Sequence, residues 1–442
     1  MLLFYLFAIA INIDIQQELV DTATVPIAFW QTRQTLTTLD LDFGANTSLI
    51  KLADLIMTCT SLIKLSFTTT QPLAQLIGNF SVIGQHEALI DLQIKAKLIT
   101  GQDIEPMLKQ CQQLRRLIMN TCDETVFDVI IRQADNLKIL GYNPSFSVEE
   151  LQTNSSNKNI KGLRIFYTNN GGTSISAKKI LPLIYKNKAT LETLYVMISS
   201  VTETELWELY STYPDFMLDN IKRLTFWLNA GIQQFMLRSI RNTTNLSSLS
   251  VAYLHDEEEL VTRLMGLPVL SEFFLSHIHN SESRSSLIRL FEHYRLFSVP
   301  NNSRQPTLTY VSLRHSDAIS DDLLSKLAAI TSLHKVRLHS LSNVSVGGVN
   351  RMISTLSGRL TYLSLEEMDL IKDETIIAFG ELKKLSHLKL KNLKNVTNQG
   401  IYELLDKVNT STLTKLEIKD CPNVTKSCIA TAKKKIKVVK HI

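Results

Sequence analysis

Histidines are the first residues of this chain that could do chemistry. His277 and His279 form an H-x-H pair, and His293 follows in a helical pattern. A zinc site needs three or four ligands at suitable spacing, and no carboxylate or cysteine stands at such a spacing from these histidines. We therefore interpret them as surface histidines and predict neither a metal site nor a cofactor.

Catalytic motifs are also missing from the sequence. It holds no GxSxG, no P-loop and no GxGxxG. Acidic residues from Asp256 to Glu259 fall where a helix would begin, and there negative charge stabilises the helix without catalysis. The chain has five cysteines and no CxxC pair: Cys59, Cys111, Cys122, Cys421 and Cys428. This pattern favours reduced thiols that pack in the interior, so we predict that the protein is not an enzyme.

A repeated leucine pattern provides the framework that positions all the remaining residues. LxxLxL begins at Leu360, Leu385 and Leu413, which are 25 and 28 residues apart, as in leucine-rich repeats. The same template recurs from Leu36 onward and predicts sixteen strands. The expected fold is α/β, a leucine-rich-repeat solenoid (horseshoe) of about 16 repeats, with a parallel concave sheet and convex helices.

Apolar residues at helical spacing lie between the strands, as at 52–59. Because no repeat buries its leucines alone, the end units need protection. We expect residues 36–442 to form the repeat domain, and residues 1–35 to be an N-terminal cap or the remnant of a truncated upstream domain. The wide step from Leu270 to Leu308 predicts a longer, irregular unit at 270–307, with a long helix and a polar loop.

A second signature follows several strands: a short loop, Ile or Val, then Thr or Ser, then a helix. It is seen at 98–111, 318–327, 395–405 and 421–432, where Thr or Ser is a suitable N-cap. Cys59 and Cys111 each stand three residues before the next strand leucine. Together these features resemble the cysteine-containing leucine-rich repeats of the F-box/leucine-rich-repeat family and of antagonist-of-mitotic-exit-like proteins, the relatives that lack an F-box.

The resemblance implies a substrate-recognition subunit of a cullin-RING (SCF-type) ubiquitin ligase, which binds a protein segment on the concave face. In that family an F-box docks the ligase adaptor subunit, and residues 1–35 show no LPxE-type opening. The adaptor is therefore an expected partner only if an F-box lies upstream. The alternatives are a stand-alone interaction scaffold without a ligase role and a secreted leucine-rich-repeat glycoprotein.

The concave face can be mapped from the strand alternation, because every second residue points away from the leucines. The middle repeats then present aromatic residues and the last repeats a basic stripe, relieved by Glu366 and Glu417. Aromatic anchors beside cations suit a protein segment that is acidic or phosphorylated. The predicted partner-binding residues are Tyr195, Trp227, Phe274, Tyr310, Arg314, Lys335, Arg337, Lys389, Lys391 and Lys415.

Net charge and targeting signals limit which partners and which cellular location we expect. A formal charge of +5 on 442 residues is small, so we predict no nucleic-acid and no membrane partner. The apolar start to Ile13 is too short to span a membrane and lacks the basic start of a signal peptide. Sequons occur at Asn46, Asn79, Asn242, Asn245, Asn343, Asn395, Asn409 and Asn423. Because Asn-Val-Thr belongs to the repeat itself, these sequons do not by themselves indicate a secreted glycoprotein. Together with the reduced cysteines, this leads us to predict a cytoplasmic or nuclear protein.

Overall fold

The structure of the chain is a computed structural model. It describes residues 10–15, 34–43, 58–70, 73, 86–142, 163, 165–168, 176–197, 201–227, 230–252, 257–278, 283–297, 307–408 and 412–441. The chain divides into two compact units, Met1–Ile221 and Lys222–Ile442, and each is described by itself. Among the described helices, none is long and apolar enough to cross a membrane.

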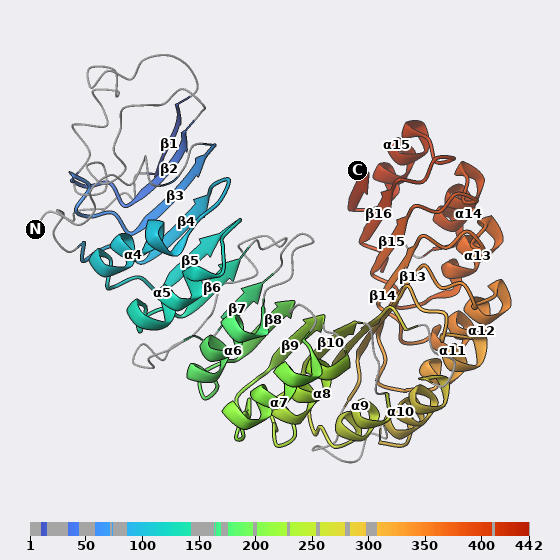
Figure 1. The fold of residues 1–442 in the computed structure, drawn as a ribbon. Helices are drawn as coiled ribbons and strands as arrows, with labels where there is room; N and C mark the ends of the chain where they lie inside the picture. The colour runs from blue at the N-terminus through green and yellow to red at the C-terminus, as the bar shows by residue number, and fades with distance from the viewer. Residues whose placement is uncertain are drawn as a thin grey trace, which may run out of the picture. The chain divides into compact units, whose positions relative to one another are not determined.

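The first unit is a parallel sheet with helices on one face (Figure 1). Its strands pair with their neighbours in chain order. The strands are β1 (Ala10–Ile15), β2 (Thr38–Phe43), β3 (Lys64–Thr69), β4 (Asp91–Lys95), β5 (Arg116–Met119), β6 (Ile139–Tyr142), β7 (Ile165–Thr168) and β8 (Thr193–Met197). The described helices are α4 (Gly101–Gln110), α5 (Thr125–Gln133), α6 (Ala177–Lys186) and α7 (Glu203–Thr212).

The second unit repeats this architecture, again with parallel pairing in chain order. Its strands are β9 (Arg223–Trp227), β10 (Ser248–Ala252), β11 (Glu272–Ser276), β12 (Tyr310–Arg314), β13 (Lys335–His339), β14 (Tyr362–Glu366), β15 (His387–Lys391), β16 (Lys415–Lys419) and β17 (Val438–His441). The helices are α8 (Ala230–Ser239), α9 (Glu257–Met265), α10 (Ser283–Phe297), α11 (Asp321–Ala328), α12 (Val346–Leu356), α13 (Asp373–Ala378), the 3-10 helix η3 (Phe379–Glu381), α14 (Asn398–Lys407) and α15 (Lys426–Lys435).

The leucine-rich-repeat fold is therefore confirmed, and each of the sixteen predicted strands is present as β2 to β17. One strand was not predicted: β1 lies within residues 1–35 and pairs with β2. The long helix expected in the unit at 270–307 is α10. The polar loop expected after it, residues 298–306, lies outside the described residues. The assignment of 1–35 and 36–442 as separate domains stays a prediction.

The core lies between the sheet and the helices, where the template leucines of the strands meet apolar residues of the helices such as Leu323 and Leu404. Leu363, Leu365, Leu388 and Leu390 are all fully buried. Cys59 and Cys111 are buried as well, as expected for residues that pack in the corner before a strand. Burial raises the pKa of the Cys111 thiol to about 12, which disfavours the nucleophilic thiolate.

A left-handed residue follows each strand from β11 to β16. Its φ lies between 44° and 58°, and its N–H donates to the last carbonyl of the next strand from β11 to β15, as Glu367 does to Lys391 at 2.9 Å. The six residues are His277, His315, Ser340, Glu367, Asn392 and Asp420. Asn, Asp and His tolerate this conformation better than most residues, whereas Glu367 lacks that preference. The row continues the sheet by one more residue and brings these six side chains to one edge.

A hydrogen-bond relay joins successive repeats on the helix side. Thr397 caps α14 by accepting from Gln399 N, and its own N–H and hydroxyl donate to Asp373 of the preceding helix at 2.7 and 2.5 Å. Ser345 donates to Asp321 in the same way, at 2.8 and 2.5 Å. The predicted N-caps at Thr100, Thr397 and Thr425 are confirmed. Ser320 occupies the N-cap position of α11 but makes no capping hydrogen bond.

Asparagine side chains form a second relay in the loops. Nδ2 of Asn343, Asn395 and Asn423 donates to the backbone carbonyls of Asp317, Asp369 and Lys394, at 2.5, 2.6 and 2.7 Å. Each bond reaches the loop of the preceding repeat. The Asn-Val-Thr and Asn-Val-Ser sequences at these positions therefore have a structural role within the repeat.

The relay predicts that Gly400→Ala destabilises the fold. A Cβ at Gly400 would lie 2.3 Å from Asp373 Oδ1, the acceptor of the cap. We expect the free energy of unfolding to fall by about 1–3 kcal/mol, although alanine is the better helix former. Urea denaturation followed by circular dichroism measures this change. Gly358→Ala is the control, because no atom lies within 4 Å of its Cβ; an equal effect of both variants would contradict the relay.

Candidate functional site

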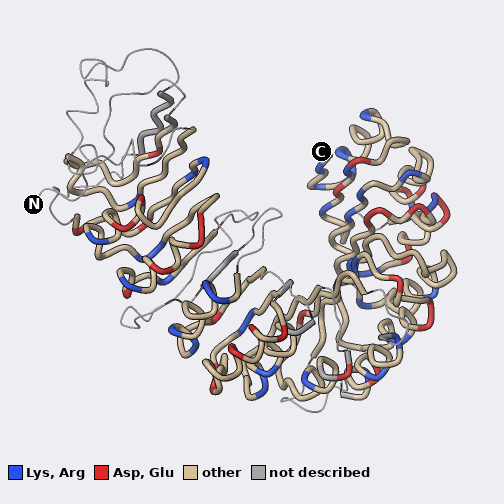
Figure 2. The backbone as a smooth tube through the Cα atoms, viewed as in Figure 1, with Lys and Arg blue, Asp and Glu red and all other residues tan. Residues whose placement is uncertain are grey.

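The candidate site is the open face of the sheet from β12 to β17. We use "open face" for the strand positions that alternate with the buried leucines, and no described helix covers it. The strands align in register, so residues of one strand position form a row across the repeats. Figure 2 shows blue segments recurring on these strands with red between them. The chemistry of this face is therefore set by which charges become neighbours in a row.

The predicted binding residues fall into separate groups. Tyr195 lies on β8 in the first unit, whereas the other nine lie in the second unit. Trp227 ends β9, but its side chain lies outside the described part of the chain. The other eight lie on the open face of β11 to β16. The structure brings together only this last group.

Aromatic rings pack on the open face around Tyr310, which lies in the first row together with Tyr362 and His387, whereas Phe274 lies one row further along its strand. Tyr310 contacts Phe274 edge to face at 4.9 Å between ring centroids and Tyr362 at 5.9 Å. Tyr362 in turn contacts His387 at 4.8 Å. Burial raises the pKa of both tyrosines, so the rings are partly enclosed by one another. Tyr362 was not predicted as a site residue, although it opens its strand in the same position as Tyr310.

Glu366 is the buried centre of the charge network. It ends β14, is 1% exposed, and lies 2.8 Å from Arg337 Nη2 and 2.9 Å from Lys389 Nζ. Ser364 Oγ also donates to it, at 2.8 Å. Burial alone would raise the pKa of this carboxyl, but the bonds from Lys389, Arg337 and Ser364 and the charge of Arg337 lower the pKa to about 2. Glu366 is thus ionised and holds the two cations in place.

This pairing changes the role of several predicted anion contacts. Arg337 and Lys389 neutralise a buried carboxylate, and Lys415 pairs with Glu417 at 2.5 Å. Reversing the charge of Arg337 or Lys389 would remove one of the two cations that neutralise buried Glu366 and place a like charge beside it, and such losses are strongly destabilising. These residues therefore support the face, and variants at them do not test binding alone.

Four lysines of the open face remain without a carboxylate at ion-pair distance in the described part of the chain: Lys335, Lys391, Lys419 and Lys440. Lys391 and Lys419 stand opposite each other on β15 and β16. Like charges in directly opposed positions destabilise a sheet. An anion bound between them would relieve this repulsion.

A histidine cluster lies where strands β11 to β13 end: His277 and His315 follow β11 and β12, and His339 is the last residue of β13. The ring of His315 packs on His339 at 4.1 Å and on His277 at 5.0 Å. His339 Nε2 lies 3.1 Å from Glu367 Oε2, and Arg314 Nε donates to His339 Nδ1 at 3.2 Å. Burial lowers the pKa of His339 and of His315. Sequence reasoning singled out His277 and missed the cluster, while His279 lies outside the described residues.

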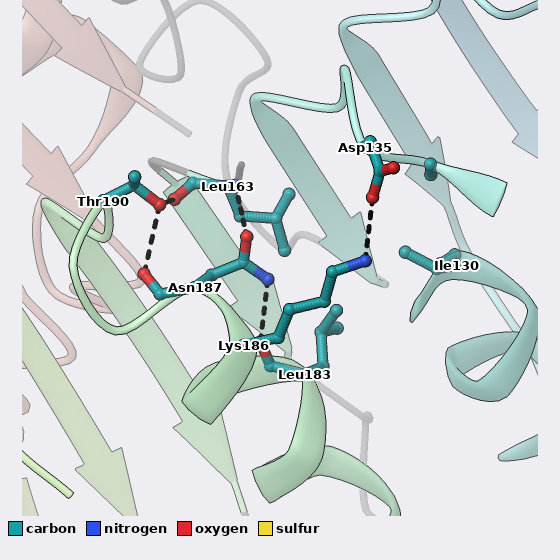
Figure 3. A pocket seen from close by; sticks show the side chains of 8 residues that line it. Ile130, Asp135, Leu163, Leu183, Lys186, Asn187 and Thr190 are labelled. Atoms are coloured by element: carbon teal, nitrogen blue, oxygen red, sulfur yellow. Dashed lines mark hydrogen bonds and ion pairs between the residues drawn. The ribbon is translucent and has the colours of Figure 1, made fainter. Parts of the chain in front are cut away.

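A cavity of about 330 Å³ lies on the helix side of the first unit (Figure 3). Its polar groups are already paired: Asn187 bonds the backbone of Leu163 and Leu183, and Lys186 pairs with Asp135. Thr190 donates to the Leu163 carbonyl. With its polar atoms engaged in this way, the cavity offers little for recognition, and the open face remains the better candidate.

The central role of Glu366 predicts a pH-dependent loss in Glu366→Gln. We expect the free energy of unfolding at pH 7 to fall by about 3 kcal/mol, because two partly buried cations lose their buried counter-ion. A pKa lowered from 4.5 to about 2 contributes stability that is present above pH 4.5 and lost as pH falls toward 2. The difference between wild type and variant should therefore shrink over that interval.

Urea unfolding measured at several pH values checks this prediction. Asp369→Asn is the control, because that carboxylate is 64% exposed and pairs with the exposed Lys394. A constant difference between wild type and Glu366→Gln from pH 7 to pH 3 would argue against an ionised Glu366.

Comparisons with known proteins give distant structural likenesses alone. No protein-family model matches the chain, and no curated protein does either. A chain in the crystal structure of the yeast Rad7 and Elc1 complex is similar at 13% identity and a TM-score of 0.44, over 83% of this chain and 77% of that one.

Two further solved structures are similar over more of this chain. They are the TLR13–ssRNA13 complex (14% identity, TM-score 0.38, 89% of this chain and 54% of that one) and the Drosophila Toll–Spatzle complex (13%, 0.40, 92% and 49%). The chain thus spans about half the length of these two. Its own repeated strands and helices establish that it has the leucine-rich-repeat fold.

Proposed function

We propose that the chain is a non-enzymatic scaffold that binds an acidic or phosphorylated protein segment on the open face of β13 to β17. The observation that carries this proposal is the set of four lysines that have no ion-pair partner among the described residues, beside cations already held by Glu366 and Glu417. Leucine-rich-repeat solenoids offer extended surfaces suited to such segments.

The geometry favours a ligand that crosses several strands. Neighbouring strands lie about 4.8 Å apart, so Lys391 and Lys419, which are opposed in register, can contact one phosphate or two successive acidic side chains. The partly enclosed ring of Tyr310 lies in the first row of the same face. Aromatic rings of this kind are frequent anchors in protein interfaces. Lysines would select the charge and the ring would hold an apolar neighbour.

The finer proposal is that this scaffold is the substrate-recognition part of a cullin-RING ubiquitin ligase. Its support is the resemblance of the repeats to the F-box/leucine-rich-repeat family, in the Thr and Ser caps and in Cys59 and Cys111. The alternative is a stand-alone scaffold without a ligase role. We further propose a cytoplasmic or nuclear location, since Asn343, Asn395 and Asn423 use their side-chain amides within the repeat.

The binding proposal predicts that Lys391→Glu/Lys419→Glu abolishes binding of acidic ligands. Three fluorescent probes are compared by anisotropy: a deca-glutamate peptide, a phosphoserine peptide and its unphosphorylated form. We expect the affinity for the first two to fall at least about tenfold, a change of about 1.4 kcal/mol. Circular dichroism should show an unchanged fold, because neither lysine makes an ion pair with a carboxylate in the described part of the chain.

Lys433→Glu/Lys434→Glu is the matched control, since it changes the net charge equally on the exposed surface of α15. Equal losses in both double variants would reduce the effect to general electrostatics and overturn the assigned face. A single-stranded DNA probe tests the other class of anion. Tighter binding of this DNA than of either peptide, lost in Lys391→Glu/Lys419→Glu, would make the face a nucleic-acid site.

The ligase proposal predicts that the bound protein is degraded. In cells, the half-life of a partner captured by the wild-type face should lengthen when Lys391→Glu/Lys419→Glu replaces the wild type. Blocking cullin activation should lengthen it to the same extent. A partner that binds but keeps its half-life under both treatments would contradict the ligase proposal and favour the stand-alone scaffold.

A further inference from the structure

The geometry points to a metal site where strands β12 to β14 end: we propose that His315, His339 and Glu367 bind a divalent transition cation of the zinc type. One ligand atom from each residue lies within 4.8 Å of the other two. Two imidazoles and one carboxylate are ligands that such cations take. The proposal does not depend on the binding function above.

The distances come close to those of a formed site. Two ligands that are each about 2.1 Å from one ion at tetrahedral angles lie about 3.4 Å apart. His339 Nε2 and Glu367 Oε2 are 3.1 Å apart. The His315 ring is only partly buried, so its rotation can shorten the remaining separation. Two ligands are thus already in place, and the third has room to approach.

The buried nitrogen is the second observation that favours an ion. His339 is only 4% exposed, and its Nε2 has Glu367 Oε2 at 3.1 Å without the alignment of a good hydrogen bond. A poorly aligned contact is weak for a buried polar atom, and one ion coordinated by both atoms would replace it. The nitrogen faces the Glu367 carboxylate, whose charge would offset that of the cation.

The fold presents the ligands through its repeats. His315 and Glu367 are the left-handed residues that follow β12 and β14, and His339 is the last residue of β13 between them. Their backbones are fixed by the ladder, in which His315 N donates to His339 O at 2.8 Å. The site is therefore preorganised by backbone bonds that a metal would not have to form.

Arg314 opposes the ion and gives the proposal a sharper test. Its Nε donates to His339 Nδ1 at 3.2 Å, which leaves the ring proton on Nε2, where the metal would bind. Coordination therefore requires that Arg314 release Nδ1, so that the proton can move there. A glutamine at 314 removes the positive charge and offers an oxygen that accepts from Nδ1–H. Arg314→Gln should therefore bind the cation more tightly than the wild type.

The experiment titrates the full chain with Zn²⁺ by calorimetry and with Co²⁺ by its visible absorption. We expect one Zn²⁺ per chain and a Co²⁺ spectrum of low coordination number. His315→Asn and Glu367→Gln should each weaken binding at least tenfold, and asparagine suits the left-handed backbone at 315. Arg314→Gln should strengthen binding at least threefold. His334→Asn is the matched control, since His334 is exposed and lies outside the cluster.

Several outcomes would overturn the proposal. One is the absence of stoichiometric binding in both wild type and Arg314→Gln at Zn²⁺ concentrations up to about 1 mM. That concentration is on the order of the dissociation constant of the weakest useful site. Another is binding that His334→Asn reduces as much as His315→Asn does. Circular dichroism of His315→Asn and Glu367→Gln distinguishes loss of the site from loss of the fold. If either variant unfolds, the cobalt absorption of Arg314→Gln is compared with that of the double variant Arg314→Gln/Glu367→Asp. Aspartate keeps the carboxylate but shortens its reach, so cobalt binding that is unchanged in the double variant would overturn the proposal.

Discussion

Parallel stacking of one repeat on the next is the constraint on which the rest of this structure depends. A single strand and helix cannot bury their leucines alone, and here Leu363, Leu365 and Leu388 reach full burial only between neighbouring repeats. The register that results is strict, with each strand position opposite the same position of the next strand. Side chains far apart in the sequence therefore meet in rows. Every feature of the open face follows from this alignment.

The alignment turns the basic stripe of the sequence into two different sets of cations. Glu366 is opposed in register by His339 and Lys391, yet its carboxylate bonds Arg337 and Lys389 diagonally. The cations it holds stabilise the sheet, and the remaining lysines are those that a ligand can meet. A count of charges along the chain does not separate these two sets, because the distinction depends on which cations Glu366 and Glu417 hold.

The sequence was sufficient for the architecture and insufficient for the site. Strand positions could be predicted because LxxLxL encodes burial directly, and the Thr caps because their bonds are local, whereas Ser320 occupies its cap position without the bond. The β1 strand lacked the template and was missed. The grouping of Arg337, Lys389 and Glu366, and that of His315, His339 and Glu367, could not be predicted. Those contacts join residues 23 to 52 positions apart and depend on rotamers and on the left-handed ends of strands.

The relay of aspartate and cap residues on the helix side also has a consequence for how such a chain can change length. In the last repeats, one helix offers an acceptor at its first residue, as Asp373 does, and the following helix supplies donors from its N-cap, as Thr397 does. Duplicating or deleting a whole repeat that carries both the acceptor and the N-cap donors restores the same bonds at the new junction. A shift of a few residues within a unit separates acceptor from donor. The array can therefore change its length by whole repeats and keep these bonds, whereas an intermediate change of length loses them at each junction that has the relay.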